Sequence, residues 1–131
     1  MKWKVKALYL YRNNKHYTVS QLYEEVFKAI GVDKLFIYES GNKCWYLNGK
    51  LHRENGPAIE LTNGYKEWWI NDKLHRKDGP AVEDANSSKE WYINGKRHRE
   101  DGPAVEWAYG HKEWWLNGEN LTEEEFIKRT K

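Results

Sequence analysis

The chain has 131 residues, which is enough for one domain with a core of its own and little more. Its 22 basic and 20 acidic residues nearly cancel, which excludes the strong single-sign field typical of nucleic-acid-binding and membrane-surface proteins. Eight Trp and nine Tyr in an otherwise polar chain predict a thin fold stabilised by aromatic side chains more than by a thick aliphatic core. A single cysteine excludes an internal disulfide, and no segment is apolar enough for a membrane span or a signal peptide. We therefore expect a cytoplasmic protein without a membrane partner.

Residues 1–42 do not repeat, and we expect them to form a β-α-β cap. Alternating large and charged side chains predict a strand over residues 2–11, and an Asn-Asn pair predicts a turn at residues 13–14. A capping box then predicts a helix over residues 18–31. A second strand, over residues 35–38, leads into the rest of the chain. This cap is expected to cover the first edge of the structure that follows.

The central part of the chain, residues 43–120, repeats with a period of 23 residues. One unit reads W-[YW]-[LI]-N-[GD]-K-x-H-R-x-[DN]-G-P-A-[VI]-E, followed by a polar turn and Lys-Glu before the next Trp. The period is carried by Trp45, Trp68, Trp91 and Trp114, by His52, His75 and His98, and by Gly56-Pro57, Gly79-Pro80 and Gly102-Pro103. Because independent features keep the same interval, we expect three full units and a truncated fourth.

Each unit contains two turn signals separated by short segments of β-prone residues. Asn-Gly and Asn-Asp pairs tolerate positive φ and predict two-residue hairpin turns at Asn48-Gly49, Asn71-Asp72, Asn94-Gly95 and Asn117-Gly118. A second turn is predicted at Asn63-Gly64, Asn86-Ser87 and Tyr109-Gly110. Segments such as residues 66–70 and 81–83 are the expected strands, with each proline at the start of a strand. The predicted fold is mainly β, an antiparallel meander with two strands and two turns per unit.

Alternation along the strands assigns the large side chains to two faces. The first face carries Trp45, Trp68, Trp91 and Trp114 with Leu47, Ile70, Ile93 and Leu116. The second, which we name the aromatic-acidic face, carries Tyr46, Trp69, Tyr92 and Trp115 with Glu67, Glu90 and Glu113. We interpret the first face as the packed side and the aromatic-acidic face as the more exposed side.

Read from Tyr46, Trp69, Tyr92 and Trp115, a Gly follows three residues later (Asp72 in the second unit), and a His follows six later in the first three units. This pattern resembles the W-x-x-G-x-x-H core of MORN repeats, which share the 23-residue period and form hairpin meanders. The resemblance covers roughly residues 43–120 and departs after the His, where R-x-[DN]-G-P-A replaces G-x-G. The variant is similar to repeats in uncharacterised phage, giant-virus and bacterial proteins. It implies a MORN-like fold and a scaffold or interaction surface as the function.

The fourth unit ends early, and residues 121–131 are expected to form a capping helix. Leu121 replaces the recurring His, and Thr122 with Glu125 forms a capping box. Leu121 and Phe126 are placed to form the matching hydrophobic staple, in a helix expected to run to about Lys128. Because such a helix would shield the last strand edge, we expect a monomer or a defined dimer and not a filament.

The recurring His-Arg-x-Asp loop raises the question of catalysis or metal binding. Equivalent residues of neighbouring units are expected about 10 Å apart, so the three histidines cannot share one zinc ion. Cys44 replaces the strand glutamate of the other units, and no residue is placed to orient His52 toward it. We therefore expect no catalytic residue, no metal and no cofactor.

Two interpretations of this loop remain. In the structural one, Arg and Asp pair across each loop while His hydrogen-bonds the backbone. In the functional one, the loops form a ladder that binds phosphates or carboxylates through Arg53, Arg76, Arg99, His52, His75 and His98.

The aromatic-acidic face also allows two interpretations. It can bind a basic peptide or a cationic ligand, with the rings as contact surfaces and the glutamates as counter-charges. Alternatively, the rings stack across strands and the glutamates pair with lysines such as Lys50, Lys73 and Lys96. The matched acidic residues argue against nucleic acid as the partner.

Together these features predict a non-enzymatic protein-binding module that acts through its repeat surface. The resemblance to phage and viral repeats implies a host protein as the partner, which the chain would modulate or inhibit in the host cytoplasm. The alternative is a protein that sequesters a nucleotide-like anion with its Arg and His loops and rings.

Overall fold

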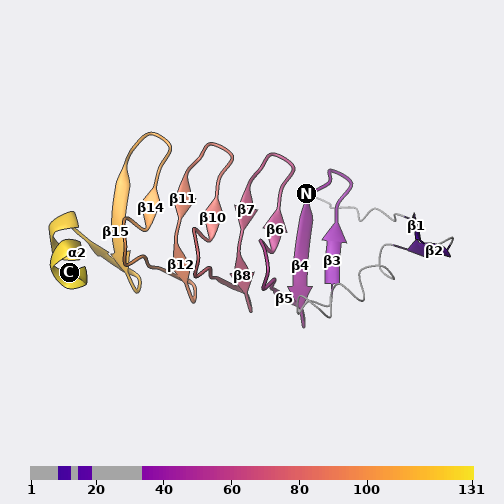
Figure 1. Cartoon of the computed structure of the whole chain (residues 1–131), viewed down its shortest axis with the longest axis horizontal. Helices are drawn as coiled ribbons and strands as arrows, with labels where there is room; N and C mark the ends of the chain where they lie inside the picture. Colours follow the sequence, from indigo (N-terminus) through magenta and orange to yellow (C-terminus); the bar gives the residue numbers. More distant parts are fainter. Residues whose placement is uncertain (1–8, 13–14, 19–33) are drawn as a thin grey trace.

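A computed structural model describes residues 9–12, 15–18 and 34–131 of the chain (Figure 1). Strands β1 (Tyr9–Arg12) and β2 (Lys15–Thr18) pair antiparallel as a separate two-stranded sheet. The predicted first strand is therefore confirmed over its last residues. The predicted turn at residues 13–14 and the predicted helix after Thr18 lie outside the described residues.

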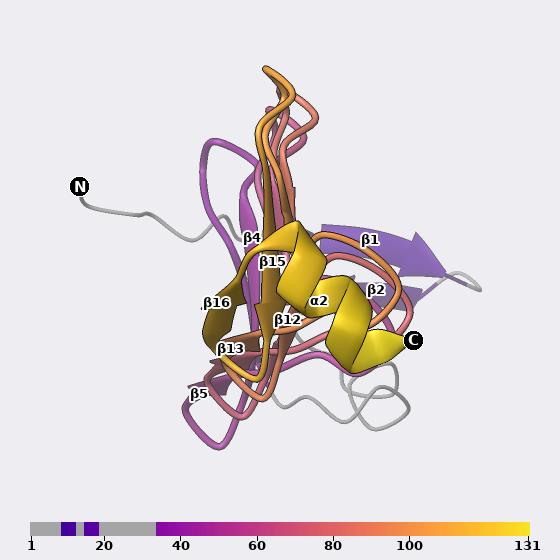
Figure 2. The same ribbon diagram turned by 90° about the vertical axis from the view of Figure 1, so that its left-hand side faces the viewer.

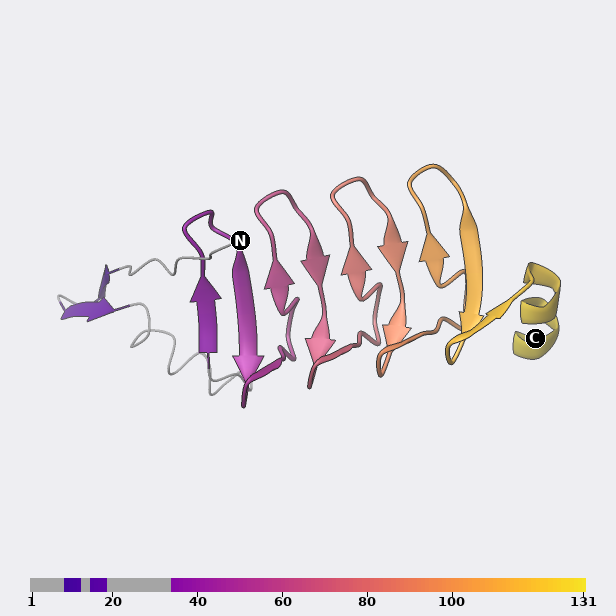
Figure 3. The same cartoon turned by 180° about the vertical axis from the view of Figure 1, so that it is seen from behind.

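Ten of the strands between residues 34 and 121 form one antiparallel sheet, and they follow one another across it in chain order (Figures 1 and 3). Its strands are β3 (Lys34–Ile37), β4 (Lys43–Leu47), β6 (Ile59–Glu60), β7 (Lys66–Glu67), β10 (Val82–Glu83), β11 (Lys89–Glu90), β14 (Val105–Glu106), β15 (Lys112–Leu116) and β16 (Glu119–Leu121), with β5 (Lys50–Leu51) paired to β4. Each period adds two strands to this sheet, as predicted. The mainly β meander is confirmed.

In the second and third units, the hairpin at the predicted Asn turn forms a separate two-stranded sheet, and this separation from the large sheet was not predicted. Strand β8 (Trp69–Ile70) pairs with β9 (Lys73–Leu74), and β12 (Tyr92–Ile93) pairs with β13 (Lys96–Arg97). The segment 66–70, predicted as one strand, is therefore divided at Trp68. Its first half pairs within the large sheet, Trp68 N–H donates to Ala81 O at 2.8 Å, and its second half turns to β9.

Both predicted turn types are confirmed by their backbone angles. Asn71 and Asp72 have φ of 48° and 63°, and the three Asn-Gly pairs are also positive at both positions. This is the geometry of a two-residue turn that matches the twist of the flanking strands. In the second turn, positive φ falls on Gly64, Ser87 and Gly110, at 97°, 77° and 98°.

The sheet has a single layer, and few of its side chains are fully buried. Viewed along the long axis, the units superpose so that equivalent turns lie behind one another (Figure 2). Ala58, Ala81 and Ala104 are completely inaccessible, and the carbonyl oxygen of each accepts a hydrogen bond of 2.8 Å from the backbone N–H of the first tryptophan of its unit. No described helix is long and apolar enough to span a membrane.

The C-terminal helix covers the last strands of the sheet. Helix α2 (Glu123–Thr130) begins at the predicted capping box, with Thr122 as N-cap and Glu125 as its partner, and runs two residues beyond the predicted end. Leu121 and Phe126 are buried with Leu116, and Trp114 packs against them. The predicted hydrophobic staple is thus part of a small apolar cluster at this end.

Candidate functional site

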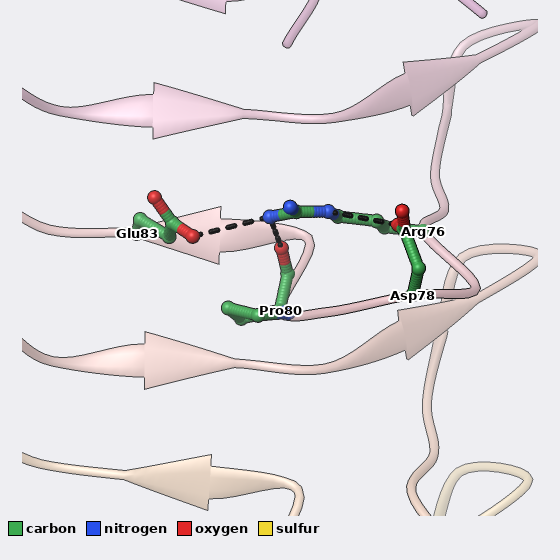
Figure 4. Close-up of polar contacts among 4 residues, drawn as sticks. All are labelled: Arg76, Asp78, Pro80 and Glu83. Carbon is green, nitrogen blue, oxygen red and sulfur yellow. Dashed lines mark hydrogen bonds and ion pairs between the residues drawn. The ribbon is translucent and has the colours of Figure 1, made fainter. Parts of the chain in front are cut away.

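The arginine of each repeat lies flat on the first tryptophan of its own unit. The Cζ atoms of Arg53, Arg76 and Arg99 lie 3.9, 3.8 and 3.9 Å from the ring centroids of Trp45, Trp68 and Trp91. Nη1 of Arg76 also donates to Pro80 O at 3.0 Å and to Glu83 at 3.1 Å (Figure 4), and the other two arginines make the same bonds. Cation–π attraction and charge-assisted hydrogen bonds therefore act on one guanidinium.

The glycine of each Gly-Pro pair leaves room for this guanidinium. A Cβ at Gly79 would lie 2.9 Å from Arg76 Cζ, and the other two glycines are as close to their arginines. Arg76 Nε also donates to Asp78 at 3.2 Å (Figure 4), and Arg99 makes the same bond to Asp101 at 2.8 Å. The Arg–Asp pairing of the structural interpretation is confirmed in these two units.

The first unit departs from this arrangement at one position. Asn55 stands where the next two units have aspartate, and Arg53 Nε is buried without a hydrogen-bond partner among the described residues. Arg53 keeps its contacts with Trp45 and Glu60. The arginine stack thus forms in all three units, but with one acceptor fewer in the first.

The repeated histidines join each unit to the next. Nδ1 of His52, His75 and His98 accepts a hydrogen bond, at 3.1, 3.0 and 2.9 Å, from the backbone N–H of Asn71, Asn94 and Asn117. Each of these asparagines begins the hairpin turn of the following unit. The prediction that His bonds the backbone is confirmed, but the backbone belongs to the next unit and not to the loop of the histidine itself.

These contacts engage the six residues considered as an anion-binding ladder. The arginines stack on tryptophan and donate within their own loops, and the histidines hold neighbouring units together. In the part of the chain that the structure describes, no group of His, Cys, Asp or Glu is arranged to hold a metal ion. The motif residues of the loop therefore have structural partners.

Glu67 on the aromatic-acidic face accepts hydrogen bonds from two rings. Trp69 Nε1 donates to one carboxylate oxygen at 2.6 Å, and the Tyr65 hydroxyl donates to the other. No ion pair involves Glu67 within the described ranges. A carboxylate has about four lone-pair sites, so two ring donors leave it able to accept from a further group.

Ring donors also bind the other two glutamates of this face. The Tyr92 hydroxyl donates to Glu90 at 3.1 Å, and Trp115 Nε1 donates to Glu113 at 2.9 Å. The alternative in which these glutamates pair with Lys50, Lys73 and Lys96 is not found, since no ion pair joins the two sets among the residues described. The donating indole and phenol rings lie two residues along the chain from the carboxylates, and they bind the carboxylates in place of the lysines.

Arg97 occupies the aromatic-acidic face between two successive units. Its guanidinium is 3.3 Å from Glu90 and lies 5.9 and 5.1 Å from the ring centroids of Tyr92 and Trp115. The equivalent residues of the two preceding units are Leu51 and Leu74. A cation between rings is therefore present at one boundary and replaced by an aliphatic side chain at the others.

The charge on Glu67 affects its neighbours. Burial, the hydrogen bond to Glu67 and the charge of Glu67 together raise the pKa of Tyr65 well above its usual value. Burial and the charge of Glu90 raise the pKa of Tyr92, whereas Arg97 acts in the opposite direction. The hydrogen bond from Trp115 holds the pKa of Glu113 below its usual value. Arg97 therefore compensates the charge of Glu90, whereas no basic side chain among the described residues forms an ion pair with Glu67.

The faces differ less in exposure than predicted. Trp45 is 6% exposed, and Leu116 is also buried, so the first face does hold buried members. The four rings of the aromatic-acidic face are partly exposed and not fully solvated. Among the described residues, the ring contact made by this set is the edge-on pair of Tyr46 with Phe36, at 5.4 Å.

Open recesses lie on both sides of the sheet. Two of about 760 and 770 Å³ separate successive Arg-bearing loops, the first between Arg53 and Arg76 and the second between Arg76 and Arg99. A third, of about 410 Å³, opens beside Trp69 and Leu74 and is also lined by Asp72, Lys73 and Lys96. The loop side and the ring side of the repeat surface thus both offer concave contact areas.

One strongly exposed ring, that of Tyr109, was not among the predicted site residues. Tyr109 is 79% exposed at the tip of the last long hairpin, with Trp107 and His111 parallel to it on either side at 6.3 Å between centroids. The equivalent Asn63 and Asn86 bond the backbone of their own turns through Oδ1, which a tyrosine cannot do. The sequence could have indicated this residue, because Tyr109 stands at a turn position where the other units have asparagine.

Cys44 lies half-buried on β4, where the other units have glutamate. Burial is the first cause that raises the pKa of its thiol above the usual value, and the charge of Glu67 adds to it. The thiolate is thereby disfavoured, and a thiol is a weak nucleophile.

The chain was compared with protein families, curated proteins and solved structures. No family model, curated protein or solved structure matches it.

Proposed function

We propose that this chain is a non-enzymatic protein-binding module that contacts its partner through the aromatic-acidic face. The observation that carries the proposal is the row of rings and carboxylates along one side of a single-layer sheet, which no second layer of described residues covers. Tyr and Trp are enriched where proteins bind one another, because they bury large areas and still offer a polar group. In line with the resemblance to phage and viral repeats, the partner is a host protein met in the cytoplasm. The chain acts on it as a monomer or a defined dimer.

The loop residues favour this face over its rival. Arg53, Arg76 and Arg99 already contact tryptophan, proline and glutamate in their own units. An anion that recruits one of them competes with these bonds. The rings of the aromatic-acidic face have no comparable cover except at Arg97.

Affinity capture tests the proposal. The immobilised chain is incubated with a lysate of the cells that produce it, and retained proteins are identified by mass spectrometry. A specific partner should be retained by the native chain and lost with the Trp69→Ala, Trp115→Ala variant, because central aromatic side chains supply a large share of binding energy.

The matched control carries Lys77→Ala and Glu100→Ala on the exposed parts of the Arg-bearing loops. This variant should retain the partner. Loss of the partner with the loop variant but not with the ring variant would transfer the function to the loop side. Thermal unfolding of both variants checks that the fold is kept.

A further inference from the structure

The repeats contain an internal example of how the aromatic-acidic face binds a cation. Arg97 extends from β13 opposite Tyr92, and its guanidinium reaches Glu90 at 3.3 Å between the rings of Tyr92 and Trp115. A planar guanidinium suits this position because it donates to the carboxylate in its plane and contacts rings with its faces.

The same position in the preceding unit lacks the cation. Leu74 pairs with Trp69 across the short hairpin, as Arg97 pairs with Tyr92. The carboxylate is retained as Glu67, and the flanking rings are retained as Trp69 and Tyr92. This unit therefore has the rings and the counter-charge but no basic side chain among the described residues to neutralise it.

The two remaining boundaries differ. In the first unit Cys44 replaces the carboxylate, so a cation would find no counter-charge. In the fourth, Glu113 is approached by His111 at 3.5 Å and lies near Arg97, which lowers its capacity for another cation. One carboxylate of this face, Glu67, thus remains without an ion pair in the described part of the chain.

We propose that Glu67, with Trp69 and Tyr92, binds an arginine side chain of the partner in the manner shown by Arg97 at Glu90. The inference rests on the proposed protein-binding function and names the group that the face recognises. The recess beside Trp69 and Leu74 provides space next to the Trp69 ring, although Lys73 and Lys96 also line it and Glu67 and Tyr92 do not. The partner segment therefore contributes a guanidinium at one site, and the rest of its contact is with rings.

The repeat supplies two exchange variants that keep the residue types of the fold. Leu74→Arg copies the third unit into the second and fills the site from within. Arg97→Leu copies the second unit into the third and opens a site at Glu90. Glu67→Gln removes the counter-charge and keeps an acceptor for Trp69.

The test uses ¹⁵N-labelled full-length chain titrated with the peptide Gly-Gly-Arg-Gly-Gly, and follows the indole N–H signals. The Trp69 signal should shift saturably, and the same peptide with neutral citrulline should bind at least about tenfold more weakly. Leu74→Arg and Glu67→Gln should each abolish the shift. Arg97→Leu should make the Trp115 signal responsive as well.

The proposal is overturned if the citrulline peptide binds equally well or if Leu74→Arg and Glu67→Gln both leave the Trp69 shift intact. The unshifted signals of Trp45 and Trp91 report that each variant is folded. If the arginine peptide causes no shift but a captured partner is still lost with the ring variant, this inference fails and the proposed function stands.

Discussion

Asn55 shows how much one residue of the repeat contributes to its neighbours. The second and third units have Asp78 and Asp101 at this position, and each accepts a hydrogen bond from the Nε atom of its arginine. In the first unit this atom of Arg53 is buried and without a partner among the described residues. A buried donor that lacks an acceptor lowers stability, because it has lost its bond to water.

Asn55→Asp should therefore stabilise the chain by about 0.5–1 kcal/mol, the usual range for a charge-assisted bond with an exposed carboxylate. Urea unfolding at low salt measures the change. The reverse exchange, Asp78→Asn, should lower the free energy of unfolding by a similar amount. An Asn55→Asp variant that is less stable than the native chain would contradict this account of Arg53.

His75 links two units only while its Nδ1 atom is unprotonated, since that atom accepts from Asn94 N–H. Burial first, and then the charge of Lys77, lower the pKa of His75 from its ordinary 6.5. The unfolded chain consequently binds more protons on this residue than the folded chain does. The contribution of His75 to stability is complete above pH 6.5 and is lost as the pH falls through the lower folded value.

The corresponding variant is Lys77→Glu, which introduces the residue type found at Glu54 and Glu100. Removing the positive charge should reduce the loss of stability on acidification, although burial will keep part of it. The difference in urea midpoint between about pH 7.5 and about pH 5 measures this effect. An unchanged or larger loss in the variant would show that Lys77 does not act on His75.

At the scale of the element, the loop between the short hairpin and the next strand is organised around a single guanidinium. Trp68 lies on one side of Arg76, Gly79 lies against it, and Pro80 and Glu83 accept its hydrogen bonds. The φ of Gly79 is not in the left-handed region, so the backbone angle does not require a glycine here. The glycine is needed because a Cβ would lie only 2.9 Å from Arg76 Cζ.

Gly79→Ala should destabilise the chain by about 1–3 kcal/mol, the range for overpacking, because the new methyl group displaces the guanidinium from the ring. In the background of Arg76→Ala the same exchange should cost much less. A double-mutant cycle from urea unfolding gives the coupling between the two positions. Equal costs in both backgrounds would mean that Gly79 is required for a reason unrelated to Arg76.

The elements that could be predicted are those whose cause is local. The hairpin turns follow from Asn and Gly at positive φ, and the final helix follows from the Thr122 capping box. The arginine stack was not predicted, because its partners come together only after the loop has folded. The histidine link was predicted as a backbone bond but not as a bond to the next unit, whose turn lies 19 residues away.

The residues that share the aromatic-acidic face could be predicted from the sequence, but the hydrogen bonds between them could not. Strand alternation placed the rings and glutamates on one face, and the hydrogen bonds confirm that they are neighbours. Lysines were one of the two kinds of partner considered for the glutamates, because the sequence shows opposite charges but not which donors lie nearest. Ring donors two residues away along the chain bind these glutamates instead. The role of Arg97 could be recognised only from its position between two rings.

At the scale of the whole molecule, the units are joined by contacts with their neighbours. Three kinds of hydrogen bond connect each unit to the next. The histidine side chains accept from the following turn, and the backbone N–H of Arg53 donates to Trp69 O. At the second turns, the backbone N–H of Ala108 donates to Ser88 Oγ. This is the pattern of a repeat array, in which stability is a sum over units and their boundaries. The motif thus builds the array, and residues that vary between units, such as Leu74 and Arg97, can give it specificity.

The most direct test of the account is to observe which tryptophans contact a captured partner. The indole N–H signals of the ¹⁵N-labelled chain are recorded with and without the purified partner. Trp69 and Trp115 on the aromatic-acidic face should shift or broaden, whereas Trp45, Trp68 and Trp91, which lie under arginines, should stay unchanged. Changes confined to Trp45, Trp68 and Trp91 would contradict the account and place the partner on the Arg-bearing loops.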